Sequence, residues 1–387
     1  MSVETITLGC RLNFAESETI AARALAGEDW TVVNSCAVTN EAVRQTRQAI
    51  RRAHRRRPGA QILVTGCAAE LEPASFAAMP EVARVVGNSG KLRAFAPDAM
   101  TPVASGLVHK VKSFVAIQNG CDHRCTFCSI WQARGPSVSL PFEAVRDAIA
   151  REIDRGAKEI VLTGVDITDY AGGLGRLCQA LLTAEPRLTR LRLSSLDSIE
   201  IDEPLMELIA GEPRLLPHFH LSLQAGDDMV LKRMKRRHSR ADAVGTVARI
   251  KAARADASIG ADLIAGFPTE TEEMALNTLK LLKDCDVVAA HIFPFSPRPN
   301  TPAARMPQVE REIVKARAAR LRQAAADHRW RWLESFAGST QQVLIEGRGT
   351  GHTDNFAPVA VDGAERGQLP EVAITANDEH RLIGTIA

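Results

Sequence analysis

Three cysteines at a C-x3-C-x2-C spacing, Cys121, Cys125 and Cys128, constrain this chain more than any other feature of its sequence. They follow an apolar run, 113–118, that is typical of a buried strand. A loop this short can bring three thiolates to one face of a metal centre, and soft thiolate ligands select iron–sulfur clusters or zinc. Zinc would require a fourth nearby ligand, whereas three ligands leave one iron of a four-iron cluster open. The spacing therefore favours a reactive iron–sulfur site, with three unrelated buried thiols as the alternative.

The same stretch resembles the cluster loop of the radical S-adenosylmethionine (SAM) superfamily, whose usual form is Cys-x3-Cys-x-aromatic-Cys. Phe127 fills the aromatic position and is a candidate residue of the SAM pocket. The resemblance implies that the three cysteines hold a [4Fe-4S] cluster and that the amino and carboxylate groups of SAM bind its open iron. Electron transfer would then cleave SAM to a 5′-deoxyadenosyl radical.

Length and composition indicate a globular protein. The chain has 387 residues, enough for two or three domains, and 45% of them are hydrophobic. No apolar run reaches membrane-spanning length, and the N-terminus has no basic-then-apolar signal, so we expect a cytoplasmic protein without membrane association. In a reducing compartment the eight cysteines are expected to be ligands or buried thiols rather than disulfides.

Residues 1–95 alternate between strand and helix patterns, which predicts an α/β unit with a Rossmann-like parallel sheet. Cys10, Cys36 and Cys67 each come just after a predicted strand. The carboxyl ends of parallel strands share one edge of a sheet, where ligands bind, so three thiols that are distant in sequence can converge there. The alternative is that each cysteine is a small buried residue.

The motifs around these cysteines, 7–13, 34–39 and 64–67, are similar to the three N-terminal cysteine motifs of the methylthiotransferases. The resemblance implies that Cys10, Cys36 and Cys67 hold a second, auxiliary [4Fe-4S] cluster, again with one open iron.

The predicted helix after Cys36 is strongly basic, and only Glu41 is near in sequence to pair with its arginines. Unpaired like charges repel, and a phosphate backbone would relieve that repulsion without reading a nucleotide sequence. The helix is therefore a candidate nucleic-acid contact, with a solvated helix face as the alternative. Its arginines are Arg44, Arg47, Arg51, Arg52, Arg55, Arg56 and Arg57.

Residues 107–335 continue the strand–helix alternation through six units, which predicts a partial (β/α)6 barrel. The active face of such a barrel is formed by the carboxyl ends of its strands, and the cysteine loop follows the first strand onto that face. This unit is expected to be the radical SAM core.

Motifs at the predicted strand ends, 133–136, 193–197, 221–226 and 231–237 among them, also resemble those of the methylthiotransferases. The resemblance suggests Ser194, Ser195 and Gln224 as SAM-pocket residues, and the alternative is that they only close their strands. No residue is assigned as a catalytic acid or base.

Residues 338–387 contain short strand patterns separated by glycines, which predicts a small antiparallel β-barrel. The segment 351–356 resembles the start of a TRAM domain, an RNA-binding module found at this end of methylthiotransferases.

The order of the three units is similar to that of the radical SAM tRNA methylthiotransferases over nearly the whole chain. Segments 34–42 and 291–303 look closest to the subgroup that acts on threonylcarbamoyladenosine. The resemblance implies addition of a methylthio group to C2 of N6-threonylcarbamoyladenosine beside the anticodon, with two SAM molecules and two [4Fe-4S] clusters. The implied partners are a tRNA anticodon stem-loop and an electron donor of flavodoxin or ferredoxin type, and the enzyme is expected to be a monomer.

Two alternatives remain open from the sequence. A methylthiotransferase could act instead on isopentenyl-adenosine tRNA or on an aspartate of a ribosomal protein. A protein of another class, a non-catalytic RNA-binding protein with structural iron–sulfur clusters, would bind RNA without cleaving SAM.

Overall fold

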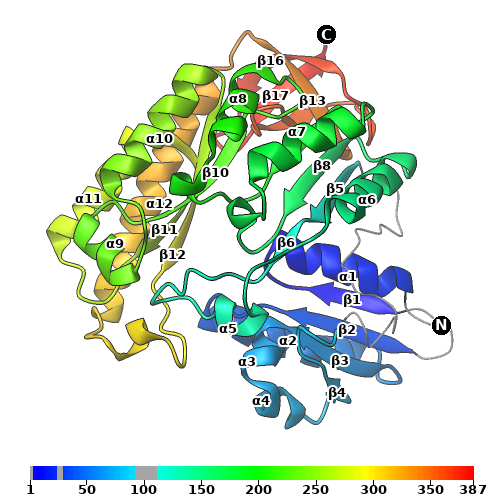
Figure 1. The fold of residues 1–387 in the computed structure, drawn as a ribbon, viewed down its shortest axis with the longest axis vertical. Helices are drawn as coiled ribbons and strands as arrows, with labels where there is room; N and C mark the ends of the chain where they lie inside the picture. The colour runs from blue at the N-terminus through cyan, green and yellow to red at the C-terminus, as the bar shows by residue number, and fades with distance from the viewer. Residues whose placement is uncertain (1–2, 24–28, 92–110) are drawn as a thin grey trace.

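The computed structural model describes residues 3–23, 29–91 and 111–387, and Figure 1 shows how they are arranged. A parallel sheet, a partial barrel of parallel strands and a small closed barrel follow one another along the chain. The expected unit boundaries near 95 and 107 lie outside the described residues. None of the helices in the described ranges combines the length and the apolar composition that a membrane span requires.

The N-terminal sheet has four strands in the order β1-β2-β3-β4, and all of its pairings are parallel, as predicted. Its two central strands are buried because helices cover the sheet. Val33 and Val64 share one hydrophobic core with the buried side chains of the helix Asn40–Arg56. The strands are β1 (Glu4–Thr7), β2 (Trp30–Ser35), β3 (Gln61–Gly66) and β4 (Arg84–Val85). The helices are α1 (Arg11–Arg23), α2 (Asn40–Arg56), α3 (Cys67–Leu71) and α4 (Pro73–Ala77).

The central unit is a partial barrel of six parallel strands, as the sequence predicts. The strands form two three-stranded sheets, β5-β8-β9 and β10-β11-β12, which isolated parallel bridges join between β9 and β10. A short antiparallel ribbon, β6 (Gln118–Asn119) with β7 (Val138–Ser139), flanks the cysteine loop. The strands are β5 (Lys112–Ala116), β8 (Glu159–Thr163), β9 (Leu191–Leu193), β10 (His218–Gln224), β11 (Ser258–Ala265) and β12 (Val287–Pro294).

Side-chain alternation along these strands separates an apolar outer layer from a polar lumen. Leu162, Leu221 and Leu263 point outward into the largest hydrophobic cluster, together with residues of the surrounding helices. Their neighbours Glu159 and Asp262 belong to the opposite, inward face. The helices are α5 (Ile130–Arg134), α6 (Phe142–Asp154), α7 (Leu174–Ala184), α8 (Glu203–Gly211), α9 (Asp228–Met234), α10 (Arg240–Ala253), α11 (Glu272–Asp284) and α12 (Arg311–Glu334).

The C-terminal unit is a closed five-stranded barrel in the order β13-β14-β15-β17-β16. Four of its pairings are antiparallel, whereas β15 and β17 pair in parallel, so the barrel is not purely antiparallel. Because β14 is a short segment with a glycine, the sequence analysis did not identify it as a strand. The strands are β13 (Thr340–Gly347), β14 (Thr350–Thr353), β15 (Pro358–Val361), β16 (Glu371–Asn377) and β17 (Leu382–Ile386).

The turn between β14 and β15 closes the amino end of the partial barrel. The ring of Phe356 stacks on His218, the first residue of β10, with ring centroids 4.8 Å apart. The guanidinium of Arg192 in β9 lies 4.9 Å from the centre of the same ring. Nearby, Arg190 donates to Asp354 at 2.5 Å. The C-terminal barrel therefore covers the end of the lumen that lies opposite the cysteine loop.

Candidate metal centres

The first cysteine triad lies at the carboxyl edge of the N-terminal sheet. Cys10 follows β1, Cys36 follows β2, and Cys67 begins α3 directly after β3. Gly9 has a φ of +93°, and a Cβ at this position would lie 2.8 Å from Sγ of Cys36, so only glycine lets the Cys10 loop approach so closely. Burial raises the pKa of the Cys36 thiol to about 11, and the charges of Cys67 and Cys10 contribute to that shift. The structure thus places the three predicted ligands side by side.

Cys10 differs from the other two thiols because it is accessible to solvent, whereas Cys36 and Cys67 are buried. Desolvation by the surrounding protein is nevertheless the main cause that raises the pKa of Cys10. Both observations hold for a thiol at the wall of an open recess, where protein surrounds it on most sides. The first triad therefore has one open side.

A buried arginine from α5 reaches into this triad. Nε of Arg134 donates to Sγ of Cys67 at 3.3 Å, and its terminal nitrogens donate to Glu16 at 2.6 and 3.0 Å and to Asn13 at 2.5 Å. The side chains of Arg134 and Glu16 are 1% and 2% exposed. Burial would raise the pKa of Glu16, but the charges of Arg134 and Lys91 outweigh it and hold that pKa below its ordinary value. The result is a buried ion-pair network that joins the N-terminal sheet to the partial barrel.

The second triad, Cys121, Cys125 and Cys128, lies in the loop between β6 and α5. Gly120 opens this loop with a φ of +78°, and a Cβ there would lie only 1.8 Å from the carbonyl oxygen of Pro136. All three thiols are free. Burial raises the pKa of Cys121 to about 12 and that of Cys128 to about 11.

The loop is held by the end of α9. The backbone nitrogen of Thr126 donates to the Met234 carbonyl at 3.0 Å, and its hydroxyl donates to the Arg233 carbonyl at 2.8 Å. Arg236, two residues beyond the helix, donates to Sγ of Cys125 at 3.7 Å and to Asp197 at 2.9 Å. A buried arginine paired with a carboxylate therefore contacts one sulfur in each triad.

His123 lies inside the second loop among three carboxylates. Its Nε2 is 2.7 Å from Asp166, and the carboxylates of Asp197 and Glu200 lie within 3.6 Å of its ring nitrogens. Hydrogen bonds to Asp166 and Glu200 raise the pKa of His123 to about 10. A protonated Nε2 donates to Asp166 and cannot accept from Arg237, which is 2.8 Å away, so Glu200 is the partner that holds Arg237.

The two triads are neighbours. α5 begins two residues after Cys128 and ends at Arg134, whose Nε contacts Cys67. The charge of Cys67 also contributes to the raised pKa of Cys128, after burial and the charge of Cys125. The N-terminal sheet therefore faces the carboxyl end of the partial barrel, and α5 lies between the two units (Figure 1).

The four residues suggested for the SAM pocket are placed at the same end of the barrel as the second triad. Ser194 and Ser195 directly follow β9, and Gln224 ends β10 with a left-handed φ of +66°. Phe127 packs against the apolar cluster beneath α9 that includes Ala225. Their contacts with SAM remain predictions.

Sequence reasoning missed the two arginines that contact the cysteines and the carboxylates around His123. Arg134 and Arg236 lie in segments that were compared with family motifs, but no local pattern shows which sulfur each one reaches. Their partners Cys67 and Cys125 are 67 and 111 residues away in sequence.

A third group of side chains lies in the lumen, away from both triads. Asp262 lies 3.0 Å from Nε2 of His220 and 3.1 Å from Nδ1 of His291. Burial would raise the pKa of Asp262, but these two contacts lower it well below its ordinary value. The ligand atoms are close enough together to share an ion, although the two hydrogen bonds already explain the arrangement.

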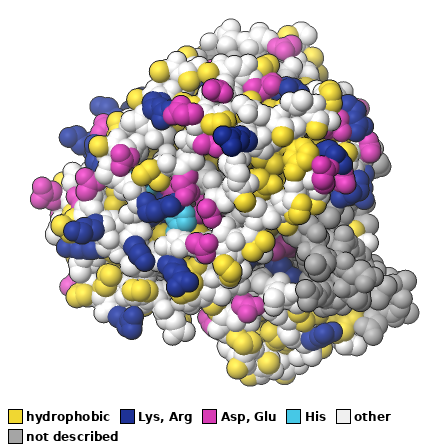
Figure 2. All heavy atoms as spheres, in the orientation of Figure 1, with side chains coloured by type: hydrophobic (Ala, Val, Ile, Leu, Met, Phe, Trp, Pro, Cys, Tyr) yellow, Lys and Arg dark blue, Asp and Glu magenta, His cyan; other side chains and the backbone are white. Residues whose placement is uncertain are grey.

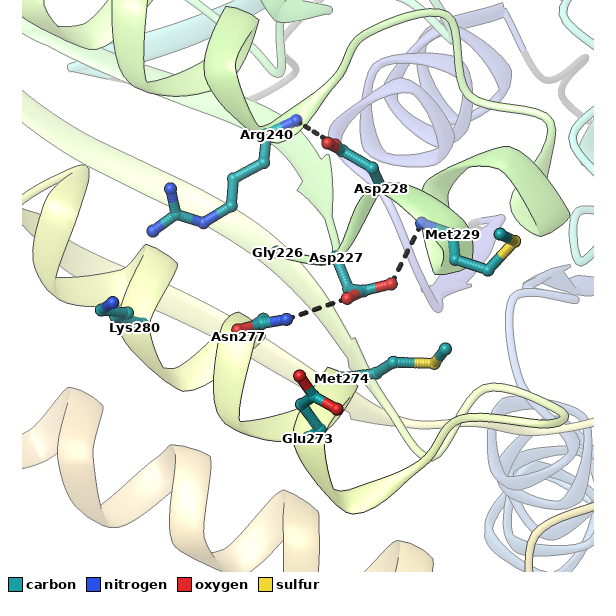
Figure 3. Close-up of a pocket in the computed structure, with 9 residues that line it drawn as sticks. All are labelled: Gly226, Asp227, Asp228, Met229, Arg240, Glu273, Met274, Asn277 and Lys280. Carbon is teal, nitrogen blue, oxygen red and sulfur yellow. Dashed lines mark hydrogen bonds between the residues drawn. The ribbon is translucent and has the colours of Figure 1, made fainter.

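A hollow of about 520 Å³ lies outside the barrel, between α9, α10 and α11, and Figure 3 shows its lining. Asp227 caps α9 by accepting from Met229 at 3.0 Å and also accepts from Asn277 at 2.9 Å. Asp228 accepts from the backbone nitrogen of Arg240. Because no cysteine lines this hollow and both of its aspartates are used in local bonds, it is not the candidate site.

The prediction that the arginines of α2 lack acidic partners other than Glu41 is wrong. Five of the seven pair with carboxylates, most of which come from elsewhere in the N-terminal unit. The pairs are Arg44 with Glu41, Arg47 with Glu72, Arg51 with Glu81, Arg56 with Glu4, and Arg57 with Glu4 and Asp29. On the face shown in Figure 2, basic and acidic side chains are likewise interspersed. The helix therefore has no run of unpaired charge.

Comparisons with known proteins agree with this arrangement. A model of the Radical SAM superfamily matches residues 115–282, and a model described as an uncharacterized protein family, UPF0004, matches residues 2–87. The chain is 43% identical to the threonylcarbamoyladenosine tRNA methylthiotransferase MtaB of Rickettsia prowazekii, over 93% of this chain and 91% of the relative. It is 34% identical to the tRNA-2-methylthio-N(6)-dimethylallyladenosine synthase of Alkalilimnicola ehrlichii, over 71% of this chain and 65% of the relative.

Among solved structures, the fold is similar to that of the radical SAM methyltransferase TsrM from Kitasatospora setae. The TM-score is 0.54 at 15% sequence identity, and the match covers 75% of this chain and 68% of that one. At this identity the likeness supports the fold alone.

Proposed function

The chain belongs to the radical SAM tRNA methylthiotransferase family, and from this premise we propose that it adds a methylthio group to C2 of N6-threonylcarbamoyladenosine beside the anticodon. The superfamily is characterised by one [4Fe-4S] cluster and SAM. The proposal adds a second cluster, held by the first cysteine triad. It also assigns residues 1–95 to the auxiliary cluster, 107–335 to SAM chemistry and 338–387 to a TRAM-like RNA contact.

The observation that carries the proposal is the juxtaposition of two cysteine triads. One triad comes from three strand ends of the N-terminal sheet, the other from one loop of the barrel, and Arg134 links them by its contact with Cys67. A protein that needed a single cluster for SAM cleavage would have no use for three more free thiols on the facing edge.

The residues present fit two such clusters. Each triad offers three free thiols, which leaves one iron of a [4Fe-4S] cluster open. Each also has a buried arginine within hydrogen-bonding distance of one sulfur, which offsets the negative charge that thiolate ligation brings. When bound, the two clusters supply an electron, a coordination site for SAM and a carrier for sulfur.

The protein's own residues shape the space around this chemistry. The N-terminal unit is fixed over the barrel mouth from two sides: Arg134 holds it at α5, and Asn40 donates to Pro297 and accepts from Arg298 in the loop after β12. A covered mouth excludes water. Attack of a radical on an aromatic C–H requires this exclusion, because it prevents side reactions of the radical. A base in a single-stranded anticodon loop leaves its stack at low cost and can enter such a site.

Anaerobic reconstitution, followed by iron counting, a 5′-deoxyadenosine assay and nucleoside analysis of tRNA, tests the proposal. We expect about eight irons per chain, cleavage of SAM, and 2-methylthio-threonylcarbamoyladenosine in the product tRNA. A modified isopentenyl-adenosine or a modified ribosomal aspartate would reassign the substrate. RNA binding without 5′-deoxyadenosine would identify a non-catalytic iron–sulfur protein.

The remaining partners are part of the proposal. The reductant is expected to be a flavodoxin- or ferredoxin-like protein, and the enzyme is expected to act as a monomer in the cytoplasm.

A further inference from the structure

The residue after the first cysteine places its charge inside the barrel of the other unit. Arg11 begins α1, and its guanidinium lies 5.9 Å from the ring centre of Phe114 in β5. Along β5, the neighbour Val115 points outward into the main hydrophobic cluster, so Phe114 faces the lumen. Arg11 therefore reaches from the N-terminal unit into the open side of the partial barrel.

The electrostatic environment of Arg11 agrees with this position. Its charge interacts with those of Glu159 in β8, Arg192 in β9 and Asp262 in β11, three residues that face the lumen from different strands. It also lowers the pKa of His218 in β10, after larger effects of burial, Arg192 and His220. Only a group inside the lumen is near all four strands at once.

The other fixed cations in this part of the lumen are already paired. Arg192 donates to Glu159 at 2.8 Å, and Lys112 pairs with Glu159 at 3.3 Å and Glu346 at 2.6 Å. Arg11, by contrast, has neither a hydrogen bond nor an ion pair to any residue of 3–23, 29–91 or 111–387. A half-buried guanidinium with its five donors unused is a site for an anionic group, and it matches a carboxylate in a bidentate way.

The His220–Asp262–His291 cluster supplies polar groups on the same inward face. Asp262 contacts both rings, so its carboxylate already has two partners. The His291 side chain is 63% exposed, and its Nε2 makes no hydrogen bond or ion pair to a residue in the described part of the chain. That nitrogen is available to a hydroxyl or an amide of a bound molecule.

We propose that Arg11 and His291 form a subsite in the lumen that binds the threonyl part of the substrate base, with Arg11 on its carboxylate and His291 on its polar groups. This inference rests on the proposed function, because the threonylcarbamoyl group is the substituent that carries a carboxylate. An isopentenyl group is apolar and would leave Arg11 desolvated without a partner, so the subsite selects against it. Arg11 is thereby a specificity-determining residue, adjacent in sequence to the cysteine Cys10.

The test pairs a change in the protein with a change in the substrate. Anticodon stem-loop RNA is prepared with threonylcarbamoyladenosine and, separately, with the same base whose carboxylate is replaced by a carboxamide. For the wild type, kcat/KM for methylthio formation should be about 10- to 100-fold higher on the carboxylate RNA, the range that a hydrogen-bonded charge supplies. Arg11→Met should lose this preference by falling on the carboxylate RNA alone, and Arg11→Lys should keep part of it.

Iron content and RNA-independent 5′-deoxyadenosine formation are measured for every variant, because Arg11 neighbours Cys10. Arg249→Met is the matched control: Arg249 is exposed on α10, pairs with the exposed Glu203, and should leave both RNAs unaffected. A wild type that does not discriminate between the two RNAs overturns the inference without any variant. Equal losses on both RNAs for Arg11→Met also overturn it. If the wild type modifies neither RNA but does modify an isopentenyl-adenosine RNA, the proposed function itself fails.

Discussion

The first triad collects Cys10, Cys36 and Cys67 from three strand ends, whereas the second takes all its cysteines from one loop, 121–128. Both have a buried arginine that donates to one sulfur and to one carboxylate. In the second triad the arginine, the cysteine and the carboxylate all belong to the partial barrel. In the first, the cysteine and the carboxylate belong to the N-terminal unit, in α3 and α1, but the arginine comes from α5.

This difference teaches that the two centres depend on different contacts. The second triad is complete within the barrel, since α9 and its following residues hold the loop. The first triad needs the barrel docked against it for the contact with Cys67 and for Arg134, the larger of the two cationic partners of Glu16; Lys91 is the other. The proposed auxiliary centre should therefore be sensitive to the interface between the units, and the following changes test this.

Removing a ligand from each triad should have the largest effect. Cys67→Ala should lower iron from about eight to about four per chain and abolish methylthio formation, while 5′-deoxyadenosine is still produced. Cys125→Ala should remove the other half of the iron and abolish both activities. Iron analysis and product chromatography measure these outcomes, and loss of SAM cleavage in the Cys67 variant would contradict the independence of the two centres.

Removing the shared arginine should have the next largest effect. Arg134→Met removes the larger of the two cationic partners of the buried Glu16 and leaves Lys91 as the other, so we expect a loss of about 3 kcal/mol of unfolding free energy, the lower end of the range for breaking a buried pair. Denaturant unfolding of the cluster-free protein measures the loss. Arg146→Met, which breaks an exposed pair on α6, is the control and should not change the midpoint measurably. An Arg134 variant as stable as this control would show that the interface is not held by the network.

A smaller effect is expected from Arg236→Met. Asp197 is only 5% exposed, but it keeps the protonated His123 within 4 Å as an alternative cation. We expect a loss of about 2–3 kcal/mol, together with a decrease in SAM cleavage at unchanged iron in the first triad. Spectra of a Cys67→Ala background, which has only the second centre, report on this directly. If Arg236→Met instead reduced auxiliary iron, the two centres would not be separable.

The smallest effect is expected from Arg237→Met. Arg237 is half exposed and pairs with Glu200 at the rim of the second site, so screening by water limits its contribution to under about 1 kcal/mol. A stability loss as large as that of Arg134→Met would mean that the rim, rather than the buried network, holds the loop.

The sequence was sufficient for the features that depend on local pattern. The alternation of strands and helices predicts the parallel sheet and the six-stranded barrel, and positions after strand ends predict that Cys10, Cys36 and Cys67 lie together. The pairing of residues that lie far apart in the sequence cannot be predicted from local pattern. The arginines of α2 find carboxylates such as Glu72 and Glu81 on later segments, and no periodicity in the helix itself indicates those partners.

Arg134 illustrates the same limit at the candidate site. Its segment resembles a strand-end motif, but its role follows from the docking of two units that the chain connects through residues outside the described ranges. Likewise, the contact of Phe356 with His218 joins segments more than a hundred residues apart. A pattern-based prediction identifies the units and leaves the contacts between them undetermined.

The stacking of Phe356 at the amino end of the partial barrel has a consequence for how molecules enter and leave the enzyme. An aromatic ring and the ion pairs around it close the amino end of the partial barrel. Neither a cosubstrate nor a nucleotide can pass through that end. Molecules therefore enter and leave through the end where the cysteines lie or through the open side of the partial barrel between β5 and β12. Spent cosubstrate has to depart by one of these routes before fresh cosubstrate can replace it.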